Sequence, residues 1–142
     1  MRWDYSEFMS AFIRTALVVL AMLYALEATG APNTVKVSYI GARDSDSHLG
    51  AKQGISEANA QGKFLGIRYE LITTSDSTKA TAMTPIAILS TFSPSQLLRL
   101  SGIASGIPVF NVHAPDDRLR EECRANLFHT IPSHAMKFDA LQ

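Results

Sequence analysis

Segments with the character of β-strands alternate with helical segments along most of the chain, and this alternation limits the possible folds more than any other feature. Residues 86–89 (IAIL) are apolar throughout, as in a strand that is buried in a parallel sheet. Strands that alternate with helices across short turns imply an α/β fold, with a mostly parallel sheet between helices in three αβα layers. The predicted strands are 35–40, 67–73, 86–89, 109–112 and 127–131, and the predicted helices are 48–61, 78–83, 94–105, 116–123 and a last one from Ser133 to Gln142.

Glycine, proline and small polar residues mark the predicted ends of the helices. Residues 44–47 (DSDS) are suited to cap the first helix, and Gly62 is expected to end it in a left-handed conformation. Ser93 is the predicted cap of the third helix, with Pro94 at its first position and Gly106 beyond its end.

An apolar run at residues 16–26 (ALVVLAMLYAL) resembles the hydrophobic part of a secretory signal peptide. Arg2 and Arg14 precede the run, and small residues follow it at 28–31. The run is shorter than the roughly 20 residues that a membrane-spanning helix needs. These features together predict that the chain is exported.

We expect residues 1–30 to be a signal peptide that is cleaved after Gly30, and residues 31–142 to be a periplasmic domain. An uncleaved segment that anchors the chain in a membrane is the alternative, and a buried core helix is a third interpretation.

The composition narrows the classes of partner. There are 13 basic and 13 acidic side chains, so the formal net charge is zero, which argues against a nucleic-acid partner. Cys123 is the single cysteine, so the chain has no internal disulfide and no Cys-x-x-Cys site. In an oxidising compartment we expect Cys123 to be buried or paired with another chain. No cofactor is expected.

Polar residues follow several of the predicted strands, where ligands bind to sheets of this kind. Ser90, Thr91 and Ser93 lie between a strand and a helix, so their hydroxyl and N–H groups are candidates to hold a small anion. The alternative is that Ser93 only caps its helix and Ser90 only completes a turn. The predicted rim consists of residues 42–44, 73–75, 90–93 and 113–116.

Motifs for the commonest catalytic sites are absent from the sequence. It has no Gly-x-Gly-x-x-Gly after the first strand, no phosphate-binding loop and no nucleophile elbow. His113 with Asp116 or Asp117 is a candidate acid–base pair, although the aspartates are better explained as helix caps. Cys123, His129 and His134 do not have the spacing of a zinc site, so a structural or surface role is expected for each.

Two stretches resemble a known family. Residues 50–71 (GAKQGISEANAQGKFLGIRYEL) resemble type I periplasmic binding proteins, whose best-known members are the branched-chain amino acid receptors of ABC transporters. Residues 108–120 (PVFNVHAPDDRLR) and 122–136 (ECRANLFHTIPSHAM) are similar to binding proteins encoded beside PQQ-dependent alcohol dehydrogenases. The resemblance covers about residues 35–142 and the leader.

The resemblance implies the N-terminal lobe of a non-catalytic protein that clasps a small polar solute against a second lobe by a hinge motion. The solute would be amino-acid-like or related to alcohol metabolism, and a permease in the inner membrane would be the partner. The loops after the third and fourth strands supply the contacts in this family. Carried over, the ligand-binding residues are Ser90, Thr91, Ser93, His113 and Ala114.

Three other functions remain open at this point, because no second lobe follows in the sequence. The first is a lobe that pairs with another chain, which would then carry the second lobe. The second is a truncated remnant without a function of its own. The third is a small secreted enzyme that uses His113 and Asp116.

Overall fold

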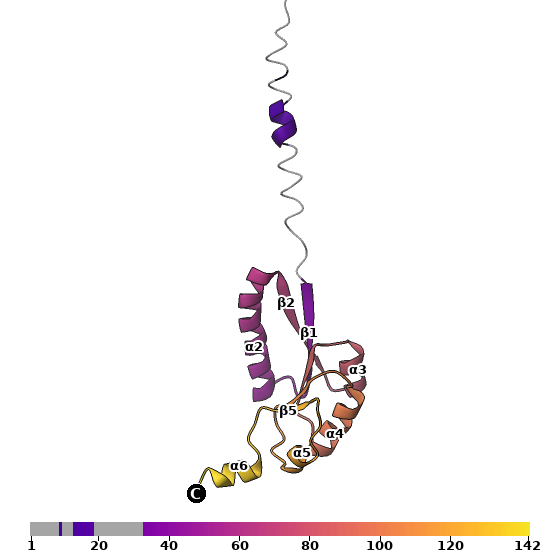
Figure 1. Ribbon diagram of the computed structural model, residues 1–142, viewed down its shortest axis with the longest axis vertical. Coiled ribbons are helices and arrows are strands. Elements are labelled where there is room, and N and C mark those ends of the chain that lie inside the picture. Colours follow the sequence, from indigo (N-terminus) through magenta and orange to yellow (C-terminus); the bar gives the residue numbers. More distant parts are fainter. Residues whose placement is uncertain (1–8, 10–12, 19–32) are drawn as a thin grey trace, which may run out of the picture. The chain divides into compact units, whose positions relative to one another are not determined.

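The computed structural model describes residues 9, 13–18 and 33–142, and residues 33–142 form a compact unit (Figure 1). Residues 13–18 are helical. The rest of the predicted signal peptide and its cleavage site after Gly30 lie outside the described residues. Among the helices that the structure describes, none has the length and apolar character needed to cross a membrane.

Five strands of residues 33–142 form one sheet in the order β2-β1-β3-β4-β5, and every neighbouring pair is parallel. The predicted α/β class is therefore confirmed, with all pairs parallel. The last two strands are shorter than predicted, because the chain turns directly after Asn111 and His129. The strands are β1 (Asn33–Ile40), β2 (Ile67–Thr74), β3 (Ala87–Ser90), β4 (Val109–Asn111) and β5 (Leu127–His129).

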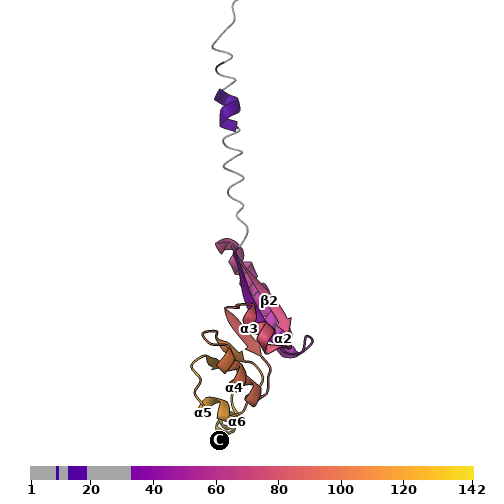
Figure 2. The same ribbon diagram turned by 90° about the vertical axis from the view of Figure 1, so that its right-hand side faces the viewer.

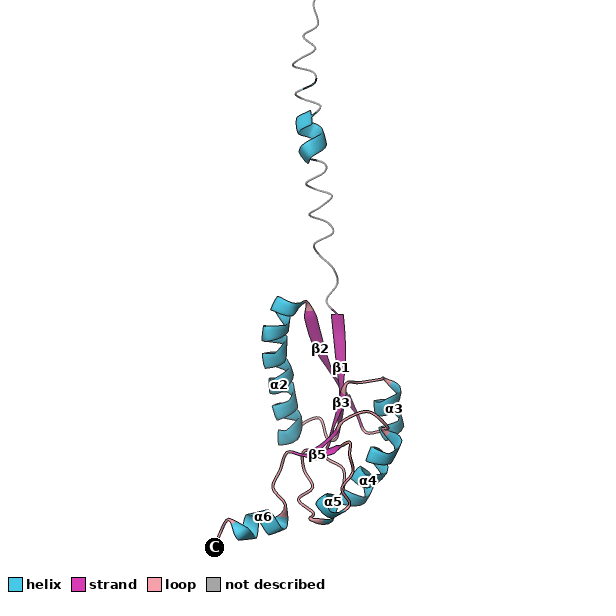
Figure 3. Ribbon diagram, in the orientation of Figure 1, coloured by secondary structure: helices cyan, strands magenta, loops and turns pink. Residues whose placement is uncertain are grey.

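Helices lie on both sides of this sheet, with α2 on one side and α3, α4 and α5 on the other (Figure 3). Figure 2 shows the sheet from the side of α3 and α4. The predicted caps are present: Ser45 accepts a hydrogen bond from the His48 N–H, and Pro94 opens the helix that follows Ser93. Asp76 caps the short helix between β2 and β3, because its side chain accepts a hydrogen bond from the Thr78 N–H at 2.8 Å. The helices are α2 (Asp46–Gly62), α3 (Ser77–Ala82), α4 (Pro94–Ile103), α5 (Arg118–Glu121) and α6 (His134–Asp139), and a 3-10 turn, η1 (Lys63–Leu65), follows α2.

The predicted left-handed conformation of Gly62 is wrong. Gly62 has a φ of −60° and remains helical, the chain continues into η1, and Gly66 takes the left-handed conformation with a φ of 65°. A Cβ atom at Gly62 would lie 2.5 Å from the carbonyl oxygen of Ile67. The glycine therefore allows the end of α2 to approach the start of β2 closely.

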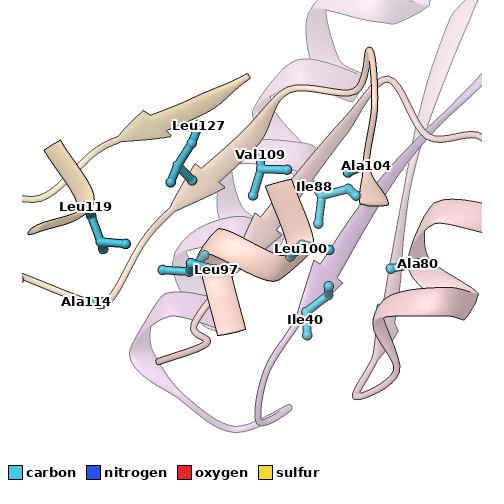
Figure 4. Close-up of a cluster of buried hydrophobic side chains, with 10 residues drawn as sticks. All are labelled: Ile40, Ala80, Ile88, Leu97, Leu100, Ala104, Val109, Ala114, Leu119 and Leu127. Atoms are coloured by element: carbon cyan, nitrogen blue, oxygen red, sulfur yellow. The ribbon is translucent and has the colours of Figure 1, made fainter. Parts of the chain in front are cut away.

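The hydrophobic core lies on the side of the sheet that α3, α4 and α5 cover (Figure 4). Ile88, Val109 and Leu127 are in register across β3, β4 and β5, so their side chains point to the same face. Leu97 and Leu100 of α4 pack against them and are buried. The cluster comprises Ile40, Ala80, Ile88, Leu97, Leu100, Ala104, Val109, Ala114, Leu119 and Leu127.

Polar contacts attach α2 to the other side of the sheet. Asn59 of α2 hydrogen-bonds the backbone of Tyr69 twice, as acceptor from its N–H at 2.7 Å and as donor to its carbonyl at 2.9 Å. The His48 ring contacts the Thr73 hydroxyl at 3.0 Å. Leu49, one of the apolar residues of the predicted helix, is 54% exposed. Because α2 lacks a broad apolar stripe, specific hydrogen bonds position this helix against the sheet.

Part of the α2 side is not covered by a helix. Leu89, Phe110 and Phe128 continue the row that begins at Tyr39, because these four residues are in register across the sheet. Tyr39 is fully buried, whereas Phe128 is 48% exposed and stacks on Phe110 with ring centroids 5.4 Å apart. The same face is therefore closed at β1 and open at β5.

Candidate functional site

The carboxyl ends of β3 and β4 bring two predicted ligand-binding loops side by side. Ser90 and Asn111 are register partners in this parallel pair, and the Val112 N–H donates to the Ser90 carbonyl at 3.1 Å. Because the strands are parallel, residues 90–93 and 113–116 leave the sheet at the same edge. The sheet topology therefore places these two loops along one rim, as the sequence predicts.

The first loop uses its hydroxyl groups within the fold. Ser90 is fully buried, and its Oγ accepts a hydrogen bond from the Phe92 N–H at 3.2 Å. Thr91 Oγ1 donates to the Ile40 carbonyl at 3.1 Å. The Oγ of Ser93 donates to the Gln96 side chain at 2.8 Å, at the start of α4. These contacts match the alternative in which Ser93 belongs to the helix start and Ser90 to the turn.

The second loop is organised by Asn111, which is fully buried at the end of β4. Its Oδ1 accepts from the N–H groups of His113 at 3.1 Å and Ala114 at 2.8 Å, and its Nδ2 donates to the Ala114 carbonyl at 2.6 Å. Ala114 is buried, whereas His113 is exposed at the rim. One side chain therefore fixes the positions of both predicted residues.

The sequence analysis did not single out Asn111, although its pattern carried a signal. An asparagine stands between Phe110 and Val112 in a segment that is otherwise apolar, and a buried amide needs hydrogen-bond partners. Asn and Asp commonly bond the backbone two residues further on, which is the geometry observed here with His113.

Asp116 and Asp117 have structural partners. The ion pair and hydrogen bonds with Arg118, at 2.8 Å for the closest atoms, hold the pKa of Asp116 below its usual value. Hydrogen bonds from Ser133 and then from the Ala135 N–H lower the pKa of Asp117. Asp116 also accepts from the Arg118 N–H, so the aspartates stabilise the starts of α5 and α6, as helix-cap roles predict.

His129, at the end of β5, contacts the Asn111 side chain: Asn111 Nδ2 lies 3.2 Å from His129 Nδ1. Burial, followed by the positive charge of Arg120, lowers the pKa of His129, while a hydrogen bond to the Leu119 backbone acts in the opposite direction. Arg120 itself donates to the Ile131 carbonyl at 2.7 Å. A titratable ring is thus in contact with the residue that organises the second loop.

A groove of about 730 Å³ lies elsewhere, between α2 and β2. Its walls include His48, Lys52 and Asn59 of the helix and Leu71 and Thr73 of the strand. Thr73 belongs to the predicted rim, but none of the five predicted ligand-binding residues lines this groove. A smaller hollow of about 290 Å³ touches Phe92 at the first loop.

The expectations for Cys123 need one correction. Cys123 is an exposed free thiol with a φ of 44°, so the interpretation that it is buried is wrong, because it lies in a tight turn after α5. Within the described residues 9, 13–18 and 33–142, no three His, Cys, Asp or Glu side chains are grouped as metal ligands.

Comparisons with the known protein families, with curated proteins and with solved structures gave no match to this chain. The structure therefore establishes the class of fold, an α/β protein with a five-stranded all-parallel sheet flanked by helices.

Proposed function

We propose that this chain is an exported solute-binding component of an ABC-type uptake system, and that residues 31–142 are its N-terminal lobe. It binds a small polar molecule, amino-acid-like or related to alcohol metabolism, and it catalyses no reaction. The partner is a permease of the inner membrane, and the chain acts in the periplasm. The proposal rests on the resemblance of residues 50–71 and 108–136 to type I periplasmic binding proteins.

One observation carries the proposal beyond that resemblance: two loops meet at the carboxyl ends of β3 and β4. His113 is exposed there, and Thr91 is partly exposed. The hydrogen bonds of Ser90 and Thr91 fix the loop backbone, so the proposed ligand contacts are the His113 ring and the rim hydroxyl groups rather than a deep cavity. A second lobe, on the same or on another chain, would complete the enclosure of the solute.

Ligand screening by NMR tests this proposal. The amide resonances of the protein are followed during the addition of single amino acids, short hydroxy acids and small alcohols. We expect shifts at Thr91, His113 and Ala114, and at least fivefold weaker binding after His113→Ala. His134→Ala is the matched control, because His134 is an exposed histidine on α6. Shifts confined to the α2 groove, or equal affinity of both variants, would contradict the proposed site.

Fractionation tests the proposed location. Cells that produce the full chain are separated into periplasmic, membrane and cytoplasmic fractions, and the N-terminus of the product is sequenced. Ala31 as the first residue of a periplasmic product supports the proposal. An intact Met1 in the membrane fraction would favour the anchored alternative.

A second function is a module that pairs with another chain. Its support is the open part of the sheet, where Phe128 is 48% exposed, and the 68% exposure of Phe138 on α6. Sedimentation at increasing concentration distinguishes the two functions. A monomer at every concentration argues against self-association through this surface.

A further inference from the structure

The loop that presents His113 and Ala114 depends on the orientation of one amide. Asn111 Oδ1 accepts two backbone N–H groups, from His113 and Ala114, and these groups lie within 3.1 Å. Reversing the amide would place an NH₂ group against two donors and would leave them without an acceptor. The orientation of Asn111 is therefore fixed by the backbone of the loop it holds.

This orientation determines the protonation of His129. Asn111 Nδ2 gives one hydrogen to the Ala114 carbonyl at 2.6 Å and directs the other at His129 Nδ1, at 3.2 Å. An NH₂ group is only a donor, so Nδ1 must be an acceptor, and the proton of the neutral ring resides on Nε2. The neutral imidazole is the form that completes the hydrogen bonding of Asn111.

A second proton on His129 is incompatible with this arrangement. The Nδ1–H of an imidazolium would face the NH₂ group of Asn111, so either the ring or the amide must move. The charged group that acts on the ring from α5 is Arg120, which adds a repulsion to the protonated form. Arg118, on the same helix, is paired with Asp116, and β4 contributes the neutral Asn111.

We propose that protonation of His129 releases the Asn111 side chain and loosens residues 112–115, so that the rim loses its affinity for solute in acid. This inference rests on the proposed solute-binding function, for which it supplies a form of regulation. His129 is a positioning residue in this scheme, because it acts on the rim through Asn111. Burial and Arg120 both lower the pKa of His129, which agrees with a neutral ring in the ordered state.

The first test needs no solute. The resonances of the His129 ring, the Asn111 side-chain NH₂ and the His113 and Ala114 amides are followed by NMR from pH 8 to pH 4. We expect all of them to change with one common midpoint, which lies below the usual pKa of a histidine side chain. Amides of residues 113 and 114 that stay unchanged while His129 titrates would overturn the proposal.

The variant His129→Gln offers a neutral side chain that cannot acquire a proton. We expect its loop amides to lose the pH-dependent change, while His134→Gln, the matched control, retains it. The titration of the natural protein remains decisive if the variant folds poorly. A loop change that persists in a folded His129→Gln protein would also overturn the proposal.

Solute affinity then separates this inference from the function on which it rests. If only the neutral form binds, the apparent affinity one pH unit below the midpoint is about tenfold weaker than at neutral pH. Equal affinity on both sides of the midpoint overturns the pH device and leaves the solute-binding function intact. A loop that follows His129 in a protein that binds no solute supports the device and contradicts the function.

Discussion

The two sides of the sheet are held by different kinds of interaction. On the side of α3, α4 and α5, apolar residues from four neighbouring strands pack with Leu97 and Leu100 in one buried cluster. On the other side, α2 is positioned by discrete hydrogen bonds from Asn59 and His48 to β2. Burial of apolar area is insensitive to small changes of angle, whereas a hydrogen bond is directional. The first side should therefore determine stability, and the second should determine the placement of a single helix.

Adjacent residues of β3 offer the most direct way to break this comparison. Ile88 is fully buried in the cluster, and Leu89 points to the other side and is partly exposed. We expect Ile88→Ala to lower the free energy of unfolding by about 2–5 kcal/mol, because it leaves a cavity. Leu89→Ala should cost only about 1–2 kcal/mol. Urea denaturation of both variants measures the difference, and equal losses would show that the two sides contribute alike.

Asn59 tests the polar attachment of α2. Asn59→Ala leaves the N–H and carbonyl of Tyr69 without their side-chain partner. We therefore expect the free energy of unfolding to fall by about 1–3 kcal/mol. The control is Gln53→Ala on the same helix, which removes an exposed contact with Glu57 and should cost about 0.5 kcal/mol or less. Amide exchange along α2 should increase in the first variant alone. A loss no larger than that of the control would mean that other contacts position the helix.

The two connections that lead into β2 and β3 contain residues with similar backbone angles. Gly66 has a φ of 65° and precedes β2, and Thr84 has a φ of 48° and precedes β3. A β-branched residue is strained in this conformation. We therefore expect Thr84→Gly to raise the free energy of unfolding by about 1 kcal/mol, and Gly66→Ala to lower it by about as much. Thermal unfolding of the two variants gives both values. A loss of stability in Thr84→Gly would mean that contacts of the threonine outweigh its strain.

Phe128 gives the smallest expected effect, at the open part of the α2 side. Phe128→Thr removes a stacked pair but keeps a residue suited to a strand, so we expect a loss of about 0.5–1 kcal/mol. Chemical denaturation again provides the measurement. A loss comparable to that of Ile88→Ala would show that this surface belongs to the core.

The alternation of strands and helices predicted the α/β class, the element order and most boundaries within a few residues. These features depend on local patterns of apolar, capping and turn residues, which the sequence contains directly. The roles of Gly62 and Asn59 were not predictable, because each depends on how closely α2 approaches β2. The sequence predicted that residues 90–93 and 113–116 follow strands at one edge of the sheet, but it did not predict which hydrogen bonds these residues make. Ser90 and Thr91 bond within the fold, and Asn111 and His129 meet only because β4 and β5 are neighbours.

The paired hydrogen bonds between Asn59 and Tyr69 have a consequence for self-association. β2 is the outermost strand, and an uncovered outer strand offers unpaired backbone groups to strands of other molecules. The Asn59 amide satisfies both backbone groups of Tyr69, the third residue of β2, as a neighbouring strand would, and so blocks the first part of this edge. At the opposite edge, β5 is only three residues long, so it offers few backbone groups to a strand of another molecule. Loss of Asn59 would therefore open a template for fibril-like stacking during heating or concentration.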